Sequence, residues 1–178
     1  MPKCTQPLGI NFQCHLSIDM FFFLGHSDVA DLLLQRSANR DCRTKTGITS
    51  LFQACRENHV DIVELLLEHG AGVNTPFPNS RENPMTLCAE KGHTELVKLL
   101  LGKGATHDCR TKKGCTPTYL ACKEGHIEIT QILAENGTNL EMPDCRGITP
   151  IMAAYKNGHI SVSYRMIRIC CKYLHHYL

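Results

Sequence analysis

The sequence contains no tryptophan, and only 6% of its 178 residues are aromatic. Nucleic-acid-binding surfaces use aromatic side chains to stack against bases, so this scarcity argues against such a surface. The formal net charge is only +2, which by itself does not indicate a polyanion partner. No apolar run approaches the roughly 18 to 20 residues of a membrane-spanning helix. The composition therefore excludes a membrane span and makes nucleic acid the weaker alternative for a partner.

Catalytic and metal-binding motifs are missing as well. The sequence shows no hydrolase nucleophile elbow, no phosphate-binding loop and no paired-carboxylate arrangement. Eleven cysteines and ten histidines raise the question of zinc, but zinc sites need ligands clustered at short spacing. Cys170 and Cys171 are adjacent, and Cys109 with Cys115 has no second pair beside it. We therefore expect no enzyme activity, no cofactor, no metal site and no small-molecule substrate.

The amino terminus carries no convincing secretory signal, because Met1-Pro2-Lys3 leads into polar residues and the apolar run from Met20 to Leu24 is too short. Thiols remain reduced in the cytoplasm and the nucleus. We therefore expect a cytoplasmic protein with free cysteines, with the nucleus as a further compartment.

The sequence does contain one repeated motif, a Gly-His or Asn-His pair followed by an apolar stretch. The histidines of these pairs are separated by 33, 34, 33 and 33 residues, and they are His26, His59, His93, His126 and His159. A fixed period in this range is typical of stacked helical units, in which each unit contacts only its neighbours. The sequence therefore predicts a solenoid.

Each unit predicts two helices and a turn. The apolar spacing predicts helices over 27–35, 50–57, 60–68, 84–91 and 94–101. Thr49 is placed to cap the helix that follows it. Gly47 suits a turn, because glycine adopts backbone conformations that are unfavourable for other residues. Pro117 stands in a first helical turn, where its missing N–H costs nothing. One extra residue in the loop 76–82 accounts for the single interval of 34.

These units resemble ankyrin repeats. The resemblance rests on Gly47-x-Thr49, Thr116-Pro117, Thr149-Pro150, the Gly-His turns and the Leu-Leu-Leu runs, and it covers about residues 25–162. It implies an all-α solenoid of stacked helix-turn-helix units joined by β-hairpin-like loops. The order of the units is similar to the ankyrin repeats of the large ankyrin-repeat and KH-domain scaffold proteins, although no KH-type Gly-x-x-Gly loop is present here.

One departure from the family is systematic. The histidine of the family's Thr-Pro-Leu-His motif is replaced in every unit, by Phe52, Thr86, Tyr119 and Met152. We therefore expect the hydrogen bonds of that histidine to be replaced or lost, which bears on stability more than on fold.

The two ends of the chain depart from the pattern. Residues 1–24 are interpreted either as an atypical cap or as a leader foreign to the repeats, residues 25–162 as an ankyrin repeat domain of about four to five repeats, and residues 163–178 as a basic tail or capping helix. A helix lying on a membrane surface is the alternative for the last segment.

The resemblance implies a protein-binding surface on the concave face and the loop tips. We expect a protein partner with an acidic patch, because the loop tips are basic and the second helices carry acidic residues on their outer face. The candidate partner-binding residues flank the loop glycines and the Gly-His turns, and they are Arg43, Lys45, Arg56, Glu57, Phe77, Arg81, Glu90, Lys91, Arg110, Lys112, Lys113, Tyr119, Lys123, Glu124, Arg146 and Lys156.

The cysteines divide into two groups. Cys55, Cys88 and Cys122 stand in small-residue positions of the repeat, so we interpret them as packing residues. Cys42 and Cys109 lie beside arginines on loops, where nearby cations lower a thiol pKa, so they are the better candidates for reactive thiols. The interpretation that we favour for both is nevertheless an ordinary exposed cysteine.

Overall fold

The computed structural model describes residues 27–36, 39–41, 43–44, 46–78 and 80–174. The predictions for residues 1–24, Cys42, Lys45 and the last four residues lie outside the described residues. The helices are α2 (Ser27–Gln35), α3 (Ser50–Arg56), α4 (Val60–Glu68), α5 (Pro84–Lys91), α6 (Thr94–Gly102), α7 (Pro117–Glu124), α8 (Ile127–Glu135), α9 (Pro150–Lys156) and α10 (Ile160–Leu174).

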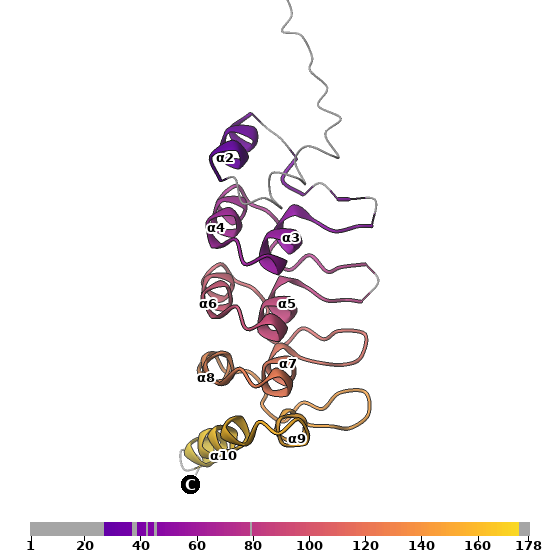
Figure 1. The fold of residues 1–178 in the computed structure, drawn as a ribbon, viewed down its shortest axis with the longest axis vertical. Coiled ribbons are helices and arrows are strands. Elements are labelled where there is room, and N and C mark those ends of the chain that lie inside the picture. The colour runs from indigo at the N-terminus through magenta and orange to yellow at the C-terminus, as the bar shows by residue number, and fades with distance from the viewer. Residues whose placement is uncertain (1–26, 37–38, 42, 45, 79, 175–178) are drawn as a thin grey trace, which may run out of the picture.

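The helices form a stack of pairs that confirms the predicted all-α solenoid. Figure 1 shows α3, α5, α7 and α9 in one column and α2, α4, α6, α8 and α10 in a second column beside it. The loops between pairs project away from the second column (Figure 1). From α3 with α4 to α9 with α10 the two helices of a unit pack against each other, and helices also pack against their counterparts in neighbouring units. Within the described residues the only β-type pairing is an isolated bridge between Arg43 and Thr49.

The predicted helix boundaries agree closely with the structure. The helix from Ser50 ends at Arg56 rather than Glu57, because Glu57 is its C-cap residue. The helix from Thr94 continues one residue further than predicted, to Gly102. Thr49 caps α3 as predicted, since its hydroxyl accepts a hydrogen bond from the Phe52 N–H at 3.2 Å.

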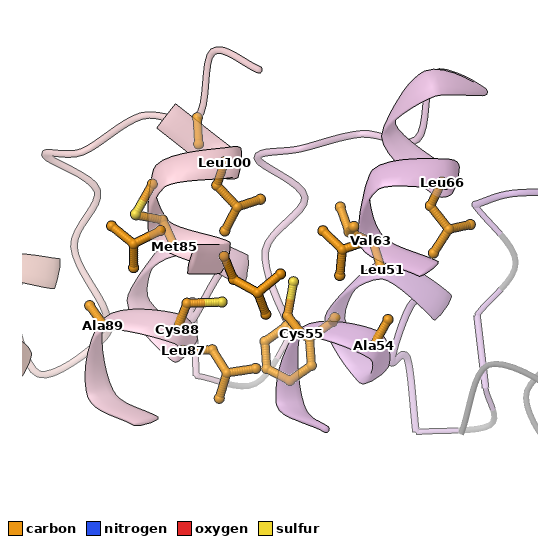
Figure 2. Packing of buried hydrophobic residues seen from close by; sticks show 14 of the residues in the cluster. Leu51, Ala54, Cys55, Val63, Leu66, Met85, Leu87, Cys88, Ala89 and Leu100 are labelled. Carbon is orange, nitrogen blue, oxygen red and sulfur yellow. The ribbon is translucent and has the colours of Figure 1, made fainter. Parts of the chain in front are cut away.

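The core depends on two small residues in succession on each first helix (Figure 2). Cys55, Cys88 and Cys122 are 0% exposed, as are the alanines beside them. Burial raises the pKa of the Cys122 thiol to about 12, and contact with the Cys55 thiol together with burial raises that of Cys88. These three cysteines are packing residues, as predicted.

Cys109 is neither the exposed cysteine nor the reactive loop thiol that the sequence analysis considered. Its side chain is half-buried, and its Sγ lies 3.4 Å from the carbonyl oxygen of Thr106. Burial raises the pKa of this thiol from its ordinary value, and the neighbouring hydrogen bonds only partly oppose that effect. The thiol is therefore less reactive than an exposed cysteine.

Of the four residues that replace the motif histidine, Thr86 and Tyr119 make side-chain hydrogen bonds of their own, whereas Phe52 and Met152 do not. The ring of Phe52 stacks on Phe77 with centroids 5.6 Å apart. Thr86 closes a capping box with Asn83, in which each backbone N–H donates to the other side chain at 2.9 Å. Tyr119 donates its hydroxyl to Asp144 at 3.1 Å, whereas Met152 is 57% exposed. The residue at the motif position therefore makes a different set of contacts in each unit.

The repeated histidines pack against the turn of the preceding unit. A Cβ at Gly92 would lie 2.6 Å from Cε1 of His126, so the glycine gives the ring room to approach. Nε2 of His126 lies 3.1 Å from the carbonyl oxygen of Glu90. Gly92 also has a φ of +82°, a conformation that glycine adopts freely.

One unit lacks this glycine. Asn58 occupies the position of Gly92 with a φ of +60°, and Nε2 of the opposing His93 is buried without a hydrogen bond of normal geometry. Burial lowers the pKa of His93, and the nearby carbonyl of Arg56 only partly offsets this effect. Asn58 carries a Cβ where Gly92 and Gly125 have none, so this unit leaves less room for the ring of the opposing histidine.

Replacing Asn58 with glycine should therefore raise the free energy of unfolding by about 0.5–1 kcal/mol, because the left-handed strain is removed and His93 gains room. Urea unfolding followed by circular dichroism measures the change. An Asn157→Gly substitution is the control, since Asn157 is a helix C-cap with a φ of −93° and gains nothing from glycine there. A loss of stability in Asn58→Gly would contradict this account.

The last helix is longer than its counterparts and runs through the expected boundary at residues 162 and 163 without a break. Val162 and Met166 of α10 are each 1% exposed and pack with Cys122 and Ala154, so this helix closes the last unit. None of the helices among the described residues is long and apolar enough to cross a membrane.

Candidate partner-binding groove

A groove of about 680 Å³ lies between the loops that precede α5, α7 and α9 and the first helices α5 and α7. Its lining residues come from three loops and from α5 and α7, and they are Ser80, Glu82, Glu90, Thr111, Lys112, Lys113, Cys115, Tyr119, Leu120, Lys123, Asp144, Cys145 and Arg146. The groove therefore spans more than one repeat, as a binding site for an extended segment must.

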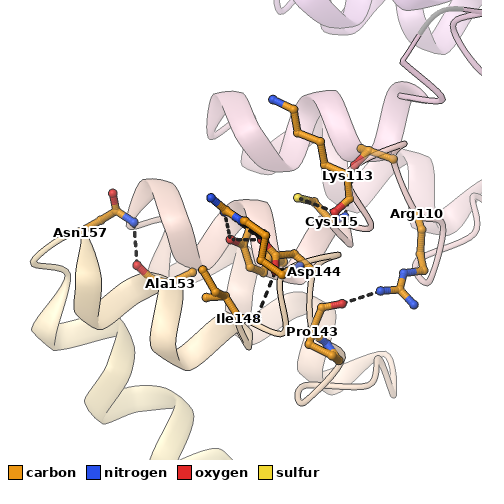
Figure 3. A network of polar contacts seen from close by, with 11 residues as sticks. Arg110, Lys113, Cys115, Pro143, Asp144, Ile148, Ala153 and Asn157 are labelled. Atoms are coloured by element: carbon orange, nitrogen blue, oxygen red, sulfur yellow. Dashed lines mark hydrogen bonds and ion pairs between the residues drawn. The ribbon is translucent and has the colours of Figure 1, made fainter.

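The loops that form one wall are hydrogen-bonded to one another. The Lys112 N–H donates to the carbonyl of Ser80 at 2.9 Å, and the Cys145 N–H donates to the carbonyl of Lys113 at 2.9 Å. The Arg110 guanidinium donates within its own loop to the carbonyl of Gly114, and across to the carbonyl of Pro143 in the next loop (Figure 3). The two backbone bonds set the spacing of the loops independently of the side chains of Lys112 and Lys113, and the exposed Arg110 side chain adds a further link.

Asp144 is the polar centre of the groove floor (Figure 3). One carboxylate oxygen accepts the backbone N–H groups of Arg146 at 2.8 Å and Ile148 at 3.0 Å. The other accepts the Tyr119 hydroxyl at 3.1 Å and the Arg146 guanidinium at 2.8 Å. Burial alone would raise the pKa of Asp144, but these hydrogen bonds outweigh it and lower the pKa to about 2. The carboxylate is thus charged and fully engaged at neutral pH.

The cations of the groove differ in how far they are already paired. Arg146 is paired with Asp144, and Lys123 is paired with Glu124, which raises the pKa of that lysine. Lys112 and Lys113 are exposed, and within the described part of the chain neither side chain makes an ion pair. These two lysines are consequently the groove's available positive charge.

The structure brings six of the predicted partner-binding residues together in this groove. They are Glu90, Lys112, Lys113, Tyr119, Lys123 and Arg146. Tyr119 requires a correction, because its side chain is 2% exposed and its hydroxyl points to Asp144. It supports the groove floor and offers no aromatic face to a ligand, since burial of the ring is what its position in the repeat demands.

The remaining predicted residues lie outside the groove lining. Arg43 donates to the carbonyl of Gly47 in its own loop, and Arg56 pairs with Glu57. Phe77 is half-buried under its stacking contact with Phe52. The others are exposed and apart from this groove, namely Arg81, Lys91, Arg110, Glu124 and Lys156, while Lys45 lies outside the described residues.

Sequence reasoning missed the groove floor, and Asp144 above all. A signal was present, because Asp144 occupies the position of Thr44 and Thr111 in earlier units. Those hydroxyls accept the N–H of Ile48 at 3.0 Å and Cys115 at 3.2 Å, so each closes its own loop. Aspartate makes the same local bond and has a second oxygen with which to reach Tyr119 and Arg146.

The described residues contain no group of three or more histidine, cysteine, aspartate or glutamate side chains arranged to hold a metal ion. The groove itself holds two thiols, of Cys115 and Cys145, and burial raises the pKa of the Cys115 thiol. The groove's side chains thus present charged groups, hydrogen-bonding groups and two thiols.

Comparison with known proteins gives consistent results. The human protein called ankyrin repeat and KH domain-containing protein 1 is 44% identical over 96 residues, which cover 53% of this chain and 4% of that protein. The Drosophila melanogaster ankyrin repeat and KH domain-containing protein mask is 41% identical over 98 residues, covering 54% and 2%. The E3 ubiquitin-protein ligase XBAT33 of Arabidopsis thaliana is 38% identical over 93 residues, covering 52% and 17%.

The chain thus spans a small part of the length of each of these relatives. The family model described as "Ankyrin repeats (3 copies)" matches residues 20–111 and 85–172. These matches take in every helix of the described stack up to residue 172 of α10. The chain belongs to the ankyrin-repeat family.

Proposed function

We propose that this chain is a protein-interaction module that holds an acidic, extended segment of a partner protein in the groove. The observation that carries the proposal is the pair of exposed lysines, Lys112 and Lys113, beside a groove whose other charges are already paired or half-buried. An incoming carboxylate meets these lysines without first breaking an ion pair, which favours fast and salt-sensitive association.

Binding of a protein is favoured over binding of a nucleic acid by the groove's lack of a stacking surface. Tyr119 is the aromatic residue of the lining, and its ring is buried. Single-stranded nucleic acids gain much of their affinity from bases stacked on exposed aromatic rings. Titration with unrelated RNA and DNA at low and physiological salt tests this alternative.

The function proposed is binding and not catalysis, in a reducing compartment such as the cytoplasm. The free cysteines among the described residues fit that setting, because Cys55, Cys88 and Cys122 are packed as thiols in the core. In this view residues 25–162 form the interaction domain together with the helix that closes it.

Reversing the charge of both groove lysines should weaken partner binding by more than tenfold. With the 178-residue chain as bait, proteins recovered from a lysate by the wild type should be depleted by at least this factor with Lys112→Glu/Lys113→Glu. A tenfold loss corresponds to about 1.4 kcal/mol. Arg110 is left unchanged because its guanidinium holds the carbonyl of Pro143. The backbone bonds of residues 112 and 113 do not depend on their side chains, so the circular-dichroism spectrum should remain the same.

A matched control reverses Asp61 and Glu64 on the exposed face of α4, away from the groove. This control should bind as the wild type does. If the α4 variant lost its partners while the lysine variant kept them, the groove assignment would be wrong.

A further inference from the structure

The C-terminal end of the stack exposes an unusual amount of apolar surface. Among the described residues, five of the seven exposed large hydrophobic side chains lie on α9 and α10. Their exposed fractions are 57% for Met152, 74% for Tyr155, 68% for Ile160, 65% for Tyr164 and 50% for Ile167. Figure 1 shows these two helices at the C-terminal end of the described stack. Exposed apolar side chains gathered on two neighbouring helices are a feature of interaction sites.

Tyr155 argues against the packing of another ankyrin unit on this end of the stack. Its counterparts in the preceding units are Cys55, Ala89 and Cys122, each 0% exposed because the next unit packs directly on them. Another ankyrin unit stacked in the same register would meet a tyrosine ring where only alanine or cysteine is accommodated. The end face is therefore shaped for a different occupant.

The outer side of α10 is changed in the same sense. The counterparts of Tyr164 are Glu64, Lys98 and Gln131, which give the other second helices a polar outer face. On α10, Ile160, Tyr164 and Ile167 follow the spacing i, i+4 and i+7 and form one exposed apolar stripe. The buried residues Val162 and Met166 hold the opposite side of the helix to the array, so this stripe is additional to the core-facing one.

Two cations accompany the stripe. Arg165 and Arg168 are exposed on α10, and Arg165 replaces the half-buried Leu65, Leu99 and Ile132 of the other units. Tyrosine and arginine are the residue types most enriched at the energetic centres of protein interfaces. A complementary partner must therefore supply apolar side chains flanked by carboxylates.

We propose that this end face, made of Met152, Tyr155, Ile160, Tyr164 and Ile167 with Arg165 and Arg168, docks an acidic amphipathic helix of a partner protein. Such a helix presents apolar residues at i, i+3, i+4 and i+7 to the face and glutamates to the two arginines. A second copy of this chain would bring two more arginines and no carboxylate from its own end face. An anionic membrane is the alternative for an apolar and basic face of this kind, and binding to vesicles is a separate outcome of the test.

The test uses the full 178-residue chain and a fluorescently labelled helical peptide of about 18 residues, with leucines on one face and glutamates beside them. Fluorescence polarisation should show saturable binding to the wild type. Tyr155→Glu/Tyr164→Glu should weaken it by more than tenfold, whereas Leu32→Glu, an exposed apolar residue at the other end, should not. Both tyrosines are largely exposed, so circular dichroism and the melting temperature should be unchanged.

A charge exchange makes the test specific. Arg165→Glu/Arg168→Glu should lower the affinity for the glutamate peptide by more than tenfold. The same variant should gain affinity for a peptide in which lysines replace the glutamates. Lys112→Glu/Lys113→Glu should bind the glutamate peptide as the wild type does, which separates this face from the groove.

Four results would overturn the proposal. They are no binding of the glutamate peptide up to millimolar concentration, binding that depends on Lys112 and Lys113 but not on the tyrosines, dimerisation abolished by the tyrosine substitutions without peptide binding, and binding to phosphatidylserine vesicles in place of the peptide.

Discussion

Replacing Leu100 with alanine should lower the free energy of unfolding by about 2–5 kcal/mol, through lost burial and the cavity left behind. Leu100 is 0% exposed and lies on α6 in the middle of the stack. It belongs to the core cluster that also contains Leu66 of α4 and Leu133 of α8 (Figure 2 shows the part around Leu66). Because each repeat is stabilised by its interfaces with both neighbours, a defect here weakens two interfaces at once.

Urea unfolding followed by circular dichroism measures this loss. Alanine is an excellent helix former, so helix propensity does not contribute to it. Leu99→Ala is the matched control, because Leu99 is the adjacent leucine of the same helix and is only half-buried. Its substitution should cost clearly less. Equal losses for the two variants would mean that α6 does not pack on the array through the face seen in the structure.

The fold was predictable because the same sequence pattern recurs in several units of the chain. The histidine spacing gave the unit length, and the positions of Thr49, Gly47 and Pro117 gave the starts of the helices. The errors at helix ends were single residues, as at Glu57 and Gly102, where capping and the last turn cannot be separated by pattern alone.

The groove was less predictable, because it depends on contacts between different units. Periodicity identifies a position in the repeat but not which of several exposed cations is already paired. In the sequence Arg146 and Lys123 were equivalent to Lys113 as exposed loop or helix cations. In the described structure Arg146 and Lys123 are each in an ion pair, whereas Lys113 is not. Tyr119 was expected at a surface and is buried, since its hydroxyl finds a carboxylate 25 residues further on.

The end face was missed for a related reason. Tyr155 and Tyr164 are ordinary residues by composition, and they become informative only when compared with the same positions of the preceding units. The sequence analysis described 163–178 as a tail or cap, and the structure shows that α10 both closes the core and carries an exposed stripe.

Replacing Gly114 with valine should destabilise the array by about 2 kcal/mol or more and should also weaken binding in the groove. Gly114 has a φ of +75°, where a β-branched residue is strained by about 1–2 kcal/mol. A Cβ at this position would lie 3.0 Å from the backbone nitrogen of Cys145 and 3.2 Å from Nη2 of Arg110. The loops that precede α7 and α9 would have to separate. This would break the hydrogen bond from the Cys145 N–H to the carbonyl of Lys113.

The array contains a matched control for this substitution. Gly147 is the counterpart of Gly114 in the next unit, with a φ of +78°, but no atom lies within 4 Å of its Cβ position. Gly147→Val should therefore show the backbone strain alone, and the difference between the two variants isolates the contact between loops. We expect that difference to be about 1 kcal/mol, the net worth of a hydrogen bond, in urea unfolding. We also expect Gly114→Val to lose more partner binding than Gly147→Val, because Lys113 and Cys145 both line the groove. Equal effects of the two valines on stability and binding would mean that the loops act independently, and that the groove does not depend on the bonds between them.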